Sequence, residues 1–367
     1  MPITISLCLI TKNEEAHLRE CLESAQPWVD EYIVVDTGST DTTISIATQL
    51  GAKVTQVEWA DDFSAARNAS LEQATGDWVI WLDADEVIPA ETGMKLRMLA
   101  SYADKKVGGF LFTVLIPAPV KGNPPERIEH LKLFRNLPEF RFTGRVHEQV
   151  YPQIAEAGYT VVPTTHTIEH AHYDSTEAGQ AKRDTYYANI LQKEIEDRPD
   201  DAFAQFNLGM VASRLNDHDL VIKSLETYHA LAPQRTTVSH KAFSVLLFSY
   251  QQQQKWEKID QILAQATRLL PHNPEILYAA GRAYYEKGDY VASLEVFEEL
   301  GEGSYVEYPA GFDPQNLHVW TPYYLGLLYS KKGDTNRAQE WLAIVAKIDP
   351  KLLDTIETIV NNEVTEL

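Results

Sequence analysis

Residues 61–86 read DDFSAARNASLEQATGDWVIWLDADE and contain three kinds of local structure in a fixed order. Phe63–Ala74 has the spacing of an amphipathic helix, Trp78–Leu82 is a continuous apolar run, and Asp83 and Asp85 follow where that run ends. A short, almost wholly apolar run is typical of a strand that is covered on both faces. The stretch therefore predicts a helix, a buried strand and two carboxylates at the carboxyl end of that strand.

The same alternation extends toward the N-terminus. Three apolar runs and two amphipathic windows follow one another there, in the order Ile3–Ile10, Glu14–Ser24, Tyr32–Val35, Asp41–Leu50 and Lys53–Val57. Ser39 or Thr40 is expected to cap the second helix. Strands that alternate with helices predict an α/β domain built on a parallel sheet.

After residue 107 the pattern changes twice. The helical period weakens up to residue 173, and four strand-like pieces appear: GGFLFTVLI, RIEHLKLF, GRVHEQVY and YTVVP. Glu177–Asp197 then has the pattern of a polar, well-formed helix. We expect residues 1–174 to form the α/β domain and residues 175–199 to form a connecting helix.

Residues 200–367 are helical and repeat themselves. Gly209, Gly281 and Gly326 occupy matching positions in three segments, and Gly288 and Gly333 each precede an aspartate in the turn that follows. The pattern resembles the tetratricopeptide repeat, whose paired helices bury their apolar faces by stacking on neighbouring pairs. An all-α domain of four such repeats is expected.

The composition restricts the partners and the compartment. The chain has 32 basic and 53 acidic residues, a net charge of -21, which repels nucleic acid and anionic lipid. Cys8 and Cys21 have no spacing that suggests zinc or a disulfide, so free thiols in a reducing compartment are expected. The N-terminus has no signal-peptide pattern, and the apolar stretch at Phe110–Ile116 is too short to span a bilayer. We expect a cytoplasmic protein, with peripheral membrane association left open.

Polar clusters follow three of the expected strands. Residues 11–15 read TKNEE, residues 36–41 read DTGSTD, and residues 83–86 read DADE. In an open α/β sheet, ligands bind at the carboxyl ends of the strands, so all three clusters should face one crevice. Asp83 and Asp85 place two carboxylates on one side of a tight turn, where they can share a hard divalent cation with a diphosphate.

These segments, together with FRN and TGRVHEQ further on, resemble the inverting glycosyltransferases of family 2. The resemblance covers roughly the first 175 residues and, with the trailing repeats, is similar to the bacterial protein or peptide glycosyltransferases. It implies a GT-A fold, a Rossmann-like fold of nucleotide-diphospho-sugar transferases, and a bound Mg²⁺ or Mn²⁺. It also implies that Asp85 binds the metal and that Asp83 binds the metal or the ribose.

The resemblance further implies a nucleotide-sugar site. Thr11 and Glu14 would line the base pocket, Asp36 would hydrogen-bond the ribose or the uracil edge, and Arg67 would contact the diphosphate. Two alternatives stay open from the residues alone. Asp36 has the setting of a turn aspartate, and Arg67 could be a surface arginine paired with an acidic neighbour.

A catalytic base is needed to take the proton of the acceptor in an inverting transfer. Glu148 stands where the family supplies this base, but the usual Glu-Asp pair is here His147-Glu148, so either residue could serve. Arg145 could steady the leaving diphosphate or pair with acidic neighbours.

The resemblance also implies a histidine ligand for the metal near the end of the domain. Three histidines cluster in THTIEHAHYD, and His172 is the expected ligand, although a structural role is common for such residues.

The sequence therefore predicts a metal-dependent glycosyltransferase that uses a nucleotide-sugar, by resemblance a UDP-sugar. The expected acceptor is a peptide or protein side chain or a cell-surface glycan, and the repeats are expected to bind protein or to mediate homodimerisation. Two alternatives remain: a catalytically silent scaffold that binds nucleotide-sugar, and a phosphatase of the haloacid-dehalogenase type, because LDADEV fits the motif of that class.

Overall fold

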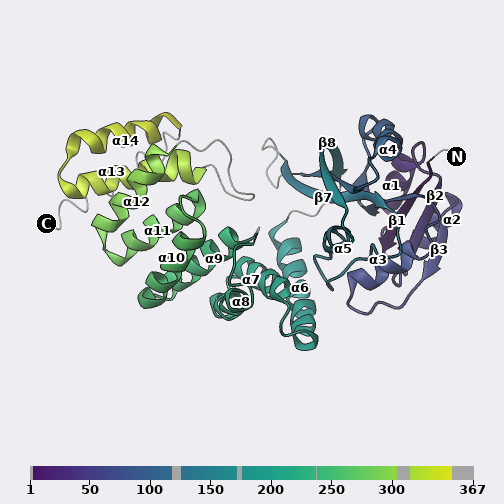
Figure 1. Cartoon of the computed structure of the whole chain (residues 1–367), viewed down its shortest axis with the longest axis horizontal. Helices are drawn as coiled ribbons and strands as arrows, with labels where there is room; N and C mark the ends of the chain where they lie inside the picture. The colour runs from purple at the N-terminus through teal and green to yellow at the C-terminus, as the bar shows by residue number, and fades with distance from the viewer. Residues whose placement is uncertain (1–2, 118–124, 172–175, 237, 304–314, 349–367) are drawn as a thin grey trace. The chain divides into compact units, whose positions relative to one another are not determined.

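The structure, a computed structural model, forms two compact units. They comprise Met1–Asp197 and Arg198–Leu367, and Figure 1 shows the sheet in the first and the helices of the second. The residues described are 3–117, 125–171, 176–236, 238–303 and 315–348.

The first unit is built on a mixed sheet with the strand order β3-β2-β1-β4-β7-β6-β8-β5 among the described residues. The first four neighbours are parallel, whereas β7 runs antiparallel to β4 and to β6. The α/β prediction is thus confirmed. The strands are β1 Ile5–Thr11, β2 Glu31–Asp36, β3 Lys53–Gln56, β4 Trp78–Asp83, β5 Glu86–Val87, β6 Val107–Ile116, β7 Glu126–Arg135 and β8 Thr160–His170.

The strand register brings the polar clusters together. Thr11 pairs with Asp36 across β1 and β2, and Ile10 pairs with Asp83 across β1 and β4. All three polar clusters therefore begin at the same edge of the sheet, because parallel strands end on the same side.

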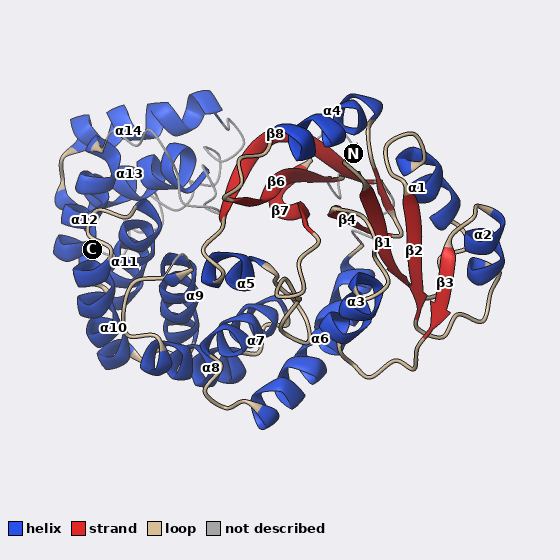
Figure 2. Cartoon of the chain, turned by 45° about the vertical axis from the view of Figure 1, so that its right-hand side comes forward, coloured by secondary structure: helices blue, strands red, loops and turns tan. Residues whose placement is uncertain are grey.

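Helices cover both faces of this sheet, as Figure 2 shows. One face packs Leu7 and Ile80 against α1, α2 and α4, and the other packs Cys8 and Trp81 against α3 and α5. Successive residues of a strand point to opposite faces, so a strand buried on both sides needs an unbroken apolar run. The helices of this unit are α1 Leu18–Ala25, α2 Thr43–Gln49, α3 Phe63–Leu71, α4 Ala90–Tyr102, α5 Tyr151–Glu156 and α6 Glu177–Asp197.

Two local predictions were wrong. The N-cap of α2 is Thr42 and not Ser39 or Thr40. The Ser39 hydroxyl instead accepts from the Asn13 N–H, and the Thr40 N–H donates to Asn13 Oδ1. The segment GRVHEQVY is a turn and not a strand, because Gly144 and His147 have φ angles of 93° and 55°. Neither angle fits an extended chain.

The second unit consists of paired helices of the tetratricopeptide type, as predicted. Asp217 and Asp289 begin the second helices of two pairs, each accepting a hydrogen bond from a backbone N–H three residues later. Gly288 and Gly333 end α11 and α13 with φ angles of 84° and 80°, which favour glycine. The helices are α7 Ala202–Arg214, α8 His218–Leu231, α9 Ser239–Gln252, α10 Trp256–Leu269, α11 Pro274–Lys287, α12 Tyr290–Glu302, α13 Thr321–Lys332 and α14 Thr335–Ile348, with a π-helix at Asn316–Trp320.

The glycines inside the first helices of three pairs permit close helix packing. A Cβ atom on Gly209, Gly281 or Gly326 would lie 2.5, 2.7 or 2.5 Å from a side chain of the partner helix, respectively. These side chains are Leu225, Phe297 and Leu342, each sixteen residues further along the chain. The repeated glycine therefore reflects a steric requirement.

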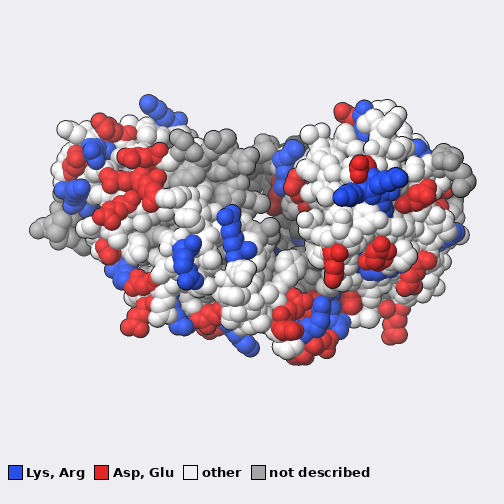
Figure 3. Space-filling view, viewed as in Figure 1, with Lys and Arg blue, Asp and Glu red and all other residues white. Residues whose placement is uncertain are grey.

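The surface carries both signs of charge. On the face drawn in Figure 3, the described Lys and Arg side chains of each unit are interspersed with Asp and Glu and form no continuous basic area. Within the described part of the chain, no helix has the length and apolar character needed to cross a membrane.

We predict that Gly281→Ala destabilises the helical unit. Alanine favours a helix by about 1 kcal/mol over glycine, but the added methyl meets the fully buried ring of Phe297, and overpacking costs about 1–3 kcal/mol. Urea unfolding followed by circular dichroism should therefore give a lower free energy of unfolding. Lys223→Ala, on the exposed face of α8, is the control and should change it by less than about 0.5 kcal/mol. A more stable Gly281→Ala protein would contradict the close packing of α11 and α12.

Candidate active site

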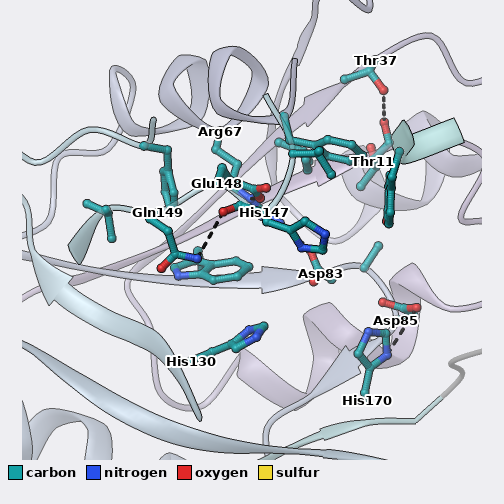
Figure 4. A pocket seen from close by; sticks show the side chains of 18 of the residues that line it. Thr11, Thr37, Arg67, Asp83, Asp85, His130, His147, Glu148, Gln149 and His170 are labelled. Atoms are coloured by element: carbon teal, nitrogen blue, oxygen red, sulfur yellow. Dashed lines mark hydrogen bonds and ion pairs between the residues drawn. The ribbon is translucent and has the colours of Figure 1, made fainter. Parts of the chain in front are cut away.

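A cavity of about 1130 Å³ opens at the carboxyl ends of the parallel strands in the first unit. It is lined by Thr11 and Glu14 after β1, by Asp83 and Asp85 after β4, and by Glu148 from the turn that precedes α5. Figure 4 shows the Asp83, Asp85 and Glu148 side chains around one space. The cavity has the size of a site for a large organic ligand.

Arg67 joins two of these carboxylates. Its Nη2 donates to Asp83 Oδ1 at 2.7 Å, its Nε donates to Glu148 Oε1, and its guanidinium lies 4.1 Å from the ring centroid of Trp81. Helix α3 carries Arg67 and begins at Asp62, whose side chain accepts from the N–H of Ala65. The arginine is buried, so the sequence alternative of a surface arginine is wrong.

A second buried cation, Lys132, forms an ion pair with Glu86 in the acidic turn. Lys132 Nζ donates to Glu86 Oε2 at 2.6 Å, and the same oxygen accepts from the backbone N–H of Asp83 at 2.9 Å. Lys132 and Glu86 are 0% and 1% exposed, and the ammonium lies 3.5 Å from the Trp81 ring centroid. The pair thereby holds the turn that carries Asp83 and Asp85.

The surroundings shift the pKa values of Asp83 and Asp85 in opposite directions. Burial alone would raise the pKa of Asp83, but Arg67 and Lys132 outweigh burial and lower it. Burial raises the pKa of Asp85, and the nearby Asp83 and Glu14 carboxylates add to this, although His170 opposes it. The negative charge gathered at this point would be relieved by a bound cation.

The residues present fit a divalent metal ion. His170 Nδ1 lies 3.5 Å from Asp85 Oδ2, and one ligand atom each of Asp83, Glu86 and His170 lie within 4.8 Å of one another. Carboxylate oxygens with an imidazole suit Mn²⁺, and carboxylates alone suit Mg²⁺. His172, the expected histidine ligand, lies outside the described residues. His170 of the same cluster is the histidine that the described structure brings to the acidic turn.

The residues expected at the nucleotide separate into two groups. Thr11 and Glu14 line the cavity. Asp36 is 0% exposed, and its Oδ1 accepts from the N–H groups of Gly38 and Ser39 at 3.0 and 2.9 Å. Its geometry is that of a turn aspartate, which was the alternative from the sequence, and its other oxygen accepts from the Thr11 hydroxyl at 3.3 Å.

The turn at residues 143–149 carries the two candidate bases and directs them differently. Backbone hydrogen bonds between Thr143 and Gln149, both 2.9 Å, close the turn. The Glu148 side chain is 10% exposed and points to Arg67, whereas His147 is exposed with its ring 5.7 Å from that of Tyr187. Arg145 Nη2 donates to Asp197 at 2.6 Å, so its guanidinium pairs with an acidic neighbour on α6.

An aromatic wall, defined here as Trp59, Phe63, Tyr186 and Tyr187, lines the cavity, and its Tyr187 ring lies 5.7 Å from that of His147 in the turn that carries Glu148. The Trp59 indole N–H donates to the Tyr186 hydroxyl at 2.7 Å, and the Phe63 ring centroid lies 6.2 Å from that of Tyr187. Helix α6 therefore contributes to the site of the first unit. The helical pattern of residues 177–197 did not signal this role.

The sequence pattern singled out neither Lys132 nor His130, which lines the cavity wall, and it indicated Glu86 only as a member of the polar cluster at residues 83–86. Lys132 lies between Leu131 and Leu133 in the buried part of β7, where the neighbouring residues are apolar. A charged residue inside that apolar run was the available signal.

Comparison with known proteins relates part of the first unit to a family model. Residues 6–152 match the family model described as glycosyl transferase family 2. The chain is 37% identical over 212 residues to a TPR repeat-containing protein of Synechococcus elongatus, covering 56% of this chain and 51% of that protein. It is 26% identical over 243 residues to the SPbeta prophage-derived glycosyltransferase SunS of Bacillus subtilis, covering 63% and 56%, respectively.

A crystal structure of TarS 1–349 from S. aureus is 16% identical, with a TM-score of 0.40, and covers 83% of this chain and 93% of that chain. The chain spans about half the length of the curated relatives named above, 51% and 56%. Neither the scaffold nor the phosphatase alternative is favoured by the family-model match and the glycosyltransferase relative.

We predict that Lys132→Met lowers the free energy of unfolding by about 3–5 kcal/mol, because Glu86 is then left as an unpaired buried carboxylate. Urea unfolding followed by tryptophan fluorescence measures the change. Replacing both members in Lys132→Met/Glu86→Gln should recover most of the loss, since no charge remains buried without a partner. A double variant as unstable as the single variant would show that the ion pair is not the cause.

Proposed function

We propose that the chain is a metal-dependent inverting glycosyltransferase that uses a UDP-sugar, and the match of residues 6–152 to the glycosyl transferase family 2 model supports this proposal. One observation carries the proposal. Asp83 and Glu148 lie at one cavity and are joined by Arg67, so a candidate cation site and a candidate base would face the same substrate.

The donor end of the cavity is the acidic turn. We propose that Asp83, Asp85 and His170 hold the divalent ion, which when bound offsets the charge of the diphosphate leaving group. Thr11 and Glu14 line the neighbouring part of the cavity and are proposed to contact the nucleoside. Asp36 accepts a hydrogen bond from the Thr11 hydroxyl and would position Thr11 at the nucleoside. Direct contact of Asp36 with the ribose or uracil stays a prediction.

Glu148 is the proposed base. Arg67 holds Oε1, which leaves Oε2 to take the proton of the acceptor. The acceptor oxygen forms a bond to the anomeric carbon while the bond from that carbon to the diphosphate oxygen breaks. The electron pair leaves with the diphosphate, and the configuration inverts because attack comes from the opposite face. His147 is the second candidate, but its ring lies beside Tyr187 at the exposed rim.

Arg67 has a role beyond the one expected from the resemblance. Its charge lies between a proposed metal ligand and the proposed base, and stacking on Trp81 fixes it there. A rigid, buried charge of this kind lowers the reorganisation needed during reaction. Contact of Arg67 or Arg145 with the diphosphate itself stays a prediction.

The acceptor is proposed to enter along the aromatic wall, because Tyr187 of this wall lies beside the turn that carries Glu148 and half-exposed aromatic rings offer large contact areas. We propose a peptide or protein segment as acceptor, with a cell-surface glycan as the other candidate. The repeat unit would bind protein or form a homodimer. Buried, unpaired Cys8 and Cys21 suit the proposed reducing, cytoplasmic compartment.

The first test measures UDP release from UDP-glucose, UDP-galactose and UDP-N-acetylglucosamine with Mn²⁺, with Mg²⁺ and with EDTA. Release should require the metal. Asp85→Asn should lower the rate by about 100-fold and weaken donor binding, because a loss of about 2.7 kcal/mol at the metal corresponds to this factor. Metal-independent release, or full activity of Asp85→Asn, would overturn the metal role.

The second test separates the base from the donor site. Glu148→Gln should lower kcat by about 100- to 10000-fold while the donor still binds in calorimetry, because the base acts on the acceptor. Glu72→Gln, on the exposed end of α3, is the matched control and should match the unaltered protein. A normal kcat for Glu148→Gln, with loss of activity in His147→Ala, would contradict the role of Glu148 and assign the base to His147.

A further inference from the structure

His130 lines the cavity, and its Nδ1 atom has no hydrogen-bond partner among the described residues. It stands on β7, and its ring stacks on that of Trp81 with centroids 6.1 Å apart and planes inclined by 23°. Figure 4 shows the imidazole in the same open space as Asp83, Glu148 and His170. The ring therefore borders the region between the proposed leaving group and the proposed base.

The ring is a neutral hydrogen-bonding group. Burial, with the nearby Lys132 ammonium, lowers the pKa of His130 to about 3, so the imidazole carries no charge at neutral pH. A neutral imidazole has one N–H donor and one acceptor nitrogen. Such a group can hydrogen-bond a sugar hydroxyl, and it contributes no positive charge to the binding of a phosphate.

The surroundings favour one tautomer. Nδ1 is buried and has no hydrogen-bond partner among the described residues. A proton on Nδ1 would be an unsatisfied buried donor, which is costly, whereas a bare lone pair is compatible with the nearby Lys132 ammonium. The proton is therefore assigned to Nε2, the other ring nitrogen, on a ring that lines the cavity.

Another histidine with an unsatisfied ring nitrogen provides a contrast. His229 Nε2 is also buried without a partner, but its ring stacks on Phe243 at 4.0 Å between helices of the repeat unit. His229 is a packing residue. His130 differs because it borders the cavity that holds the acidic turn and Glu148.

The position of the donor sugar follows from the chemistry. The bond from the anomeric carbon to the diphosphate breaks while Glu148 removes the acceptor proton. The anomeric carbon must therefore lie between a diphosphate at Asp83 and Asp85 and the carboxylate of Glu148. Arg67 and Trp81 stand along this path, and His130 stacks on the same indole ring. A sugar ring in that place would face His130.

We propose that His130 is a specificity-determining residue whose Nε2–H donates to a hydroxyl group of the donor sugar. The inference rests on the proposed glycosyltransferase function and extends it to recognition of the sugar. The nucleoside and the diphosphate would be bound elsewhere, by residues after β1 and by the acidic turn. A change at His130 should thus alter the choice of sugar and leave UDP binding intact.

The test compares how the unaltered protein and a His130 variant bind a UDP-sugar and analogues that lack one hydroxyl group. Binding of UDP, of the preferred UDP-sugar and of its monodeoxy analogues is measured by calorimetry with Mn²⁺, and the donor KM is measured by UDP release. The unaltered protein should bind one monodeoxy analogue about 3- to 10-fold more weakly than the parent, as expected for one neutral hydrogen bond. His130→Phe keeps an aromatic ring on Trp81. In this variant the difference in affinity between the parent and that one analogue should fall below about twofold, and the differences for the other analogues should not change.

The controls separate recognition from packing. UDP should bind His130→Phe as it binds the unaltered protein, within about twofold, and His130→Gln, which retains an N–H donor, should restore part of the discrimination. Equal weakening of UDP and all donors, or discrimination that persists in His130→Phe, would overturn the inference. If the unaltered protein binds neither UDP nor any UDP-sugar, the proposed function itself fails, which is a different result.

Discussion

Two buried cations beside one tryptophan make the acidic site possible. Arg67 and Lys132 lie 4.1 and 3.5 Å from the ring centroid of Trp81, and they pair with Asp83 and Glu86, respectively. Without them, several carboxylates would be withdrawn from water at one place, and each would be protonated or would force the fold open. The ion pairs therefore set both the shape of the turn after β4 and the charge that it presents to the cavity.

The same arrangement links the two halves of the proposed reaction. Arg67 bonds to Asp83 with one nitrogen and to Glu148 with another, so the groups proposed for the leaving side and for the acceptor side share one rigid support. Glu148 can reach Arg67 because the turn at residues 143–149 includes two left-handed residues, Gly144 and His147. Preorganised charge of this kind is what electrostatic stabilisation of a transition state requires.

The elements of the sheet domain could be predicted because each depends on a local pattern. Apolar runs predicted the four parallel strands to within one or two residues at most ends, and the strand register then brought the Thr11, Asp36 and Asp83 clusters to one edge. The turn of GRVHEQVY could not be predicted in this way. Its alternation favoured a strand, whereas the observed turn is bound to α3 and α6: the Ser64 hydroxyl donates to the Gly144 carbonyl, and the Arg145 N–H donates to Glu194.

The sequence by itself determined the order of the elements, the tetratricopeptide repeats and the set of carboxylates, because periodicity and strand-end chemistry are properties of neighbouring residues. Only the tertiary structure decided which side chains meet. Arg67 and Glu148 are 81 residues apart, Lys132 and Glu86 are 46 apart, and Trp59 and Tyr186 are 127 apart. Such contacts depend on how strands and helices pack, and no local pattern records them. For the same reason Arg145 lies against Asp197 of α6, and His130 lies on the wall of the cavity.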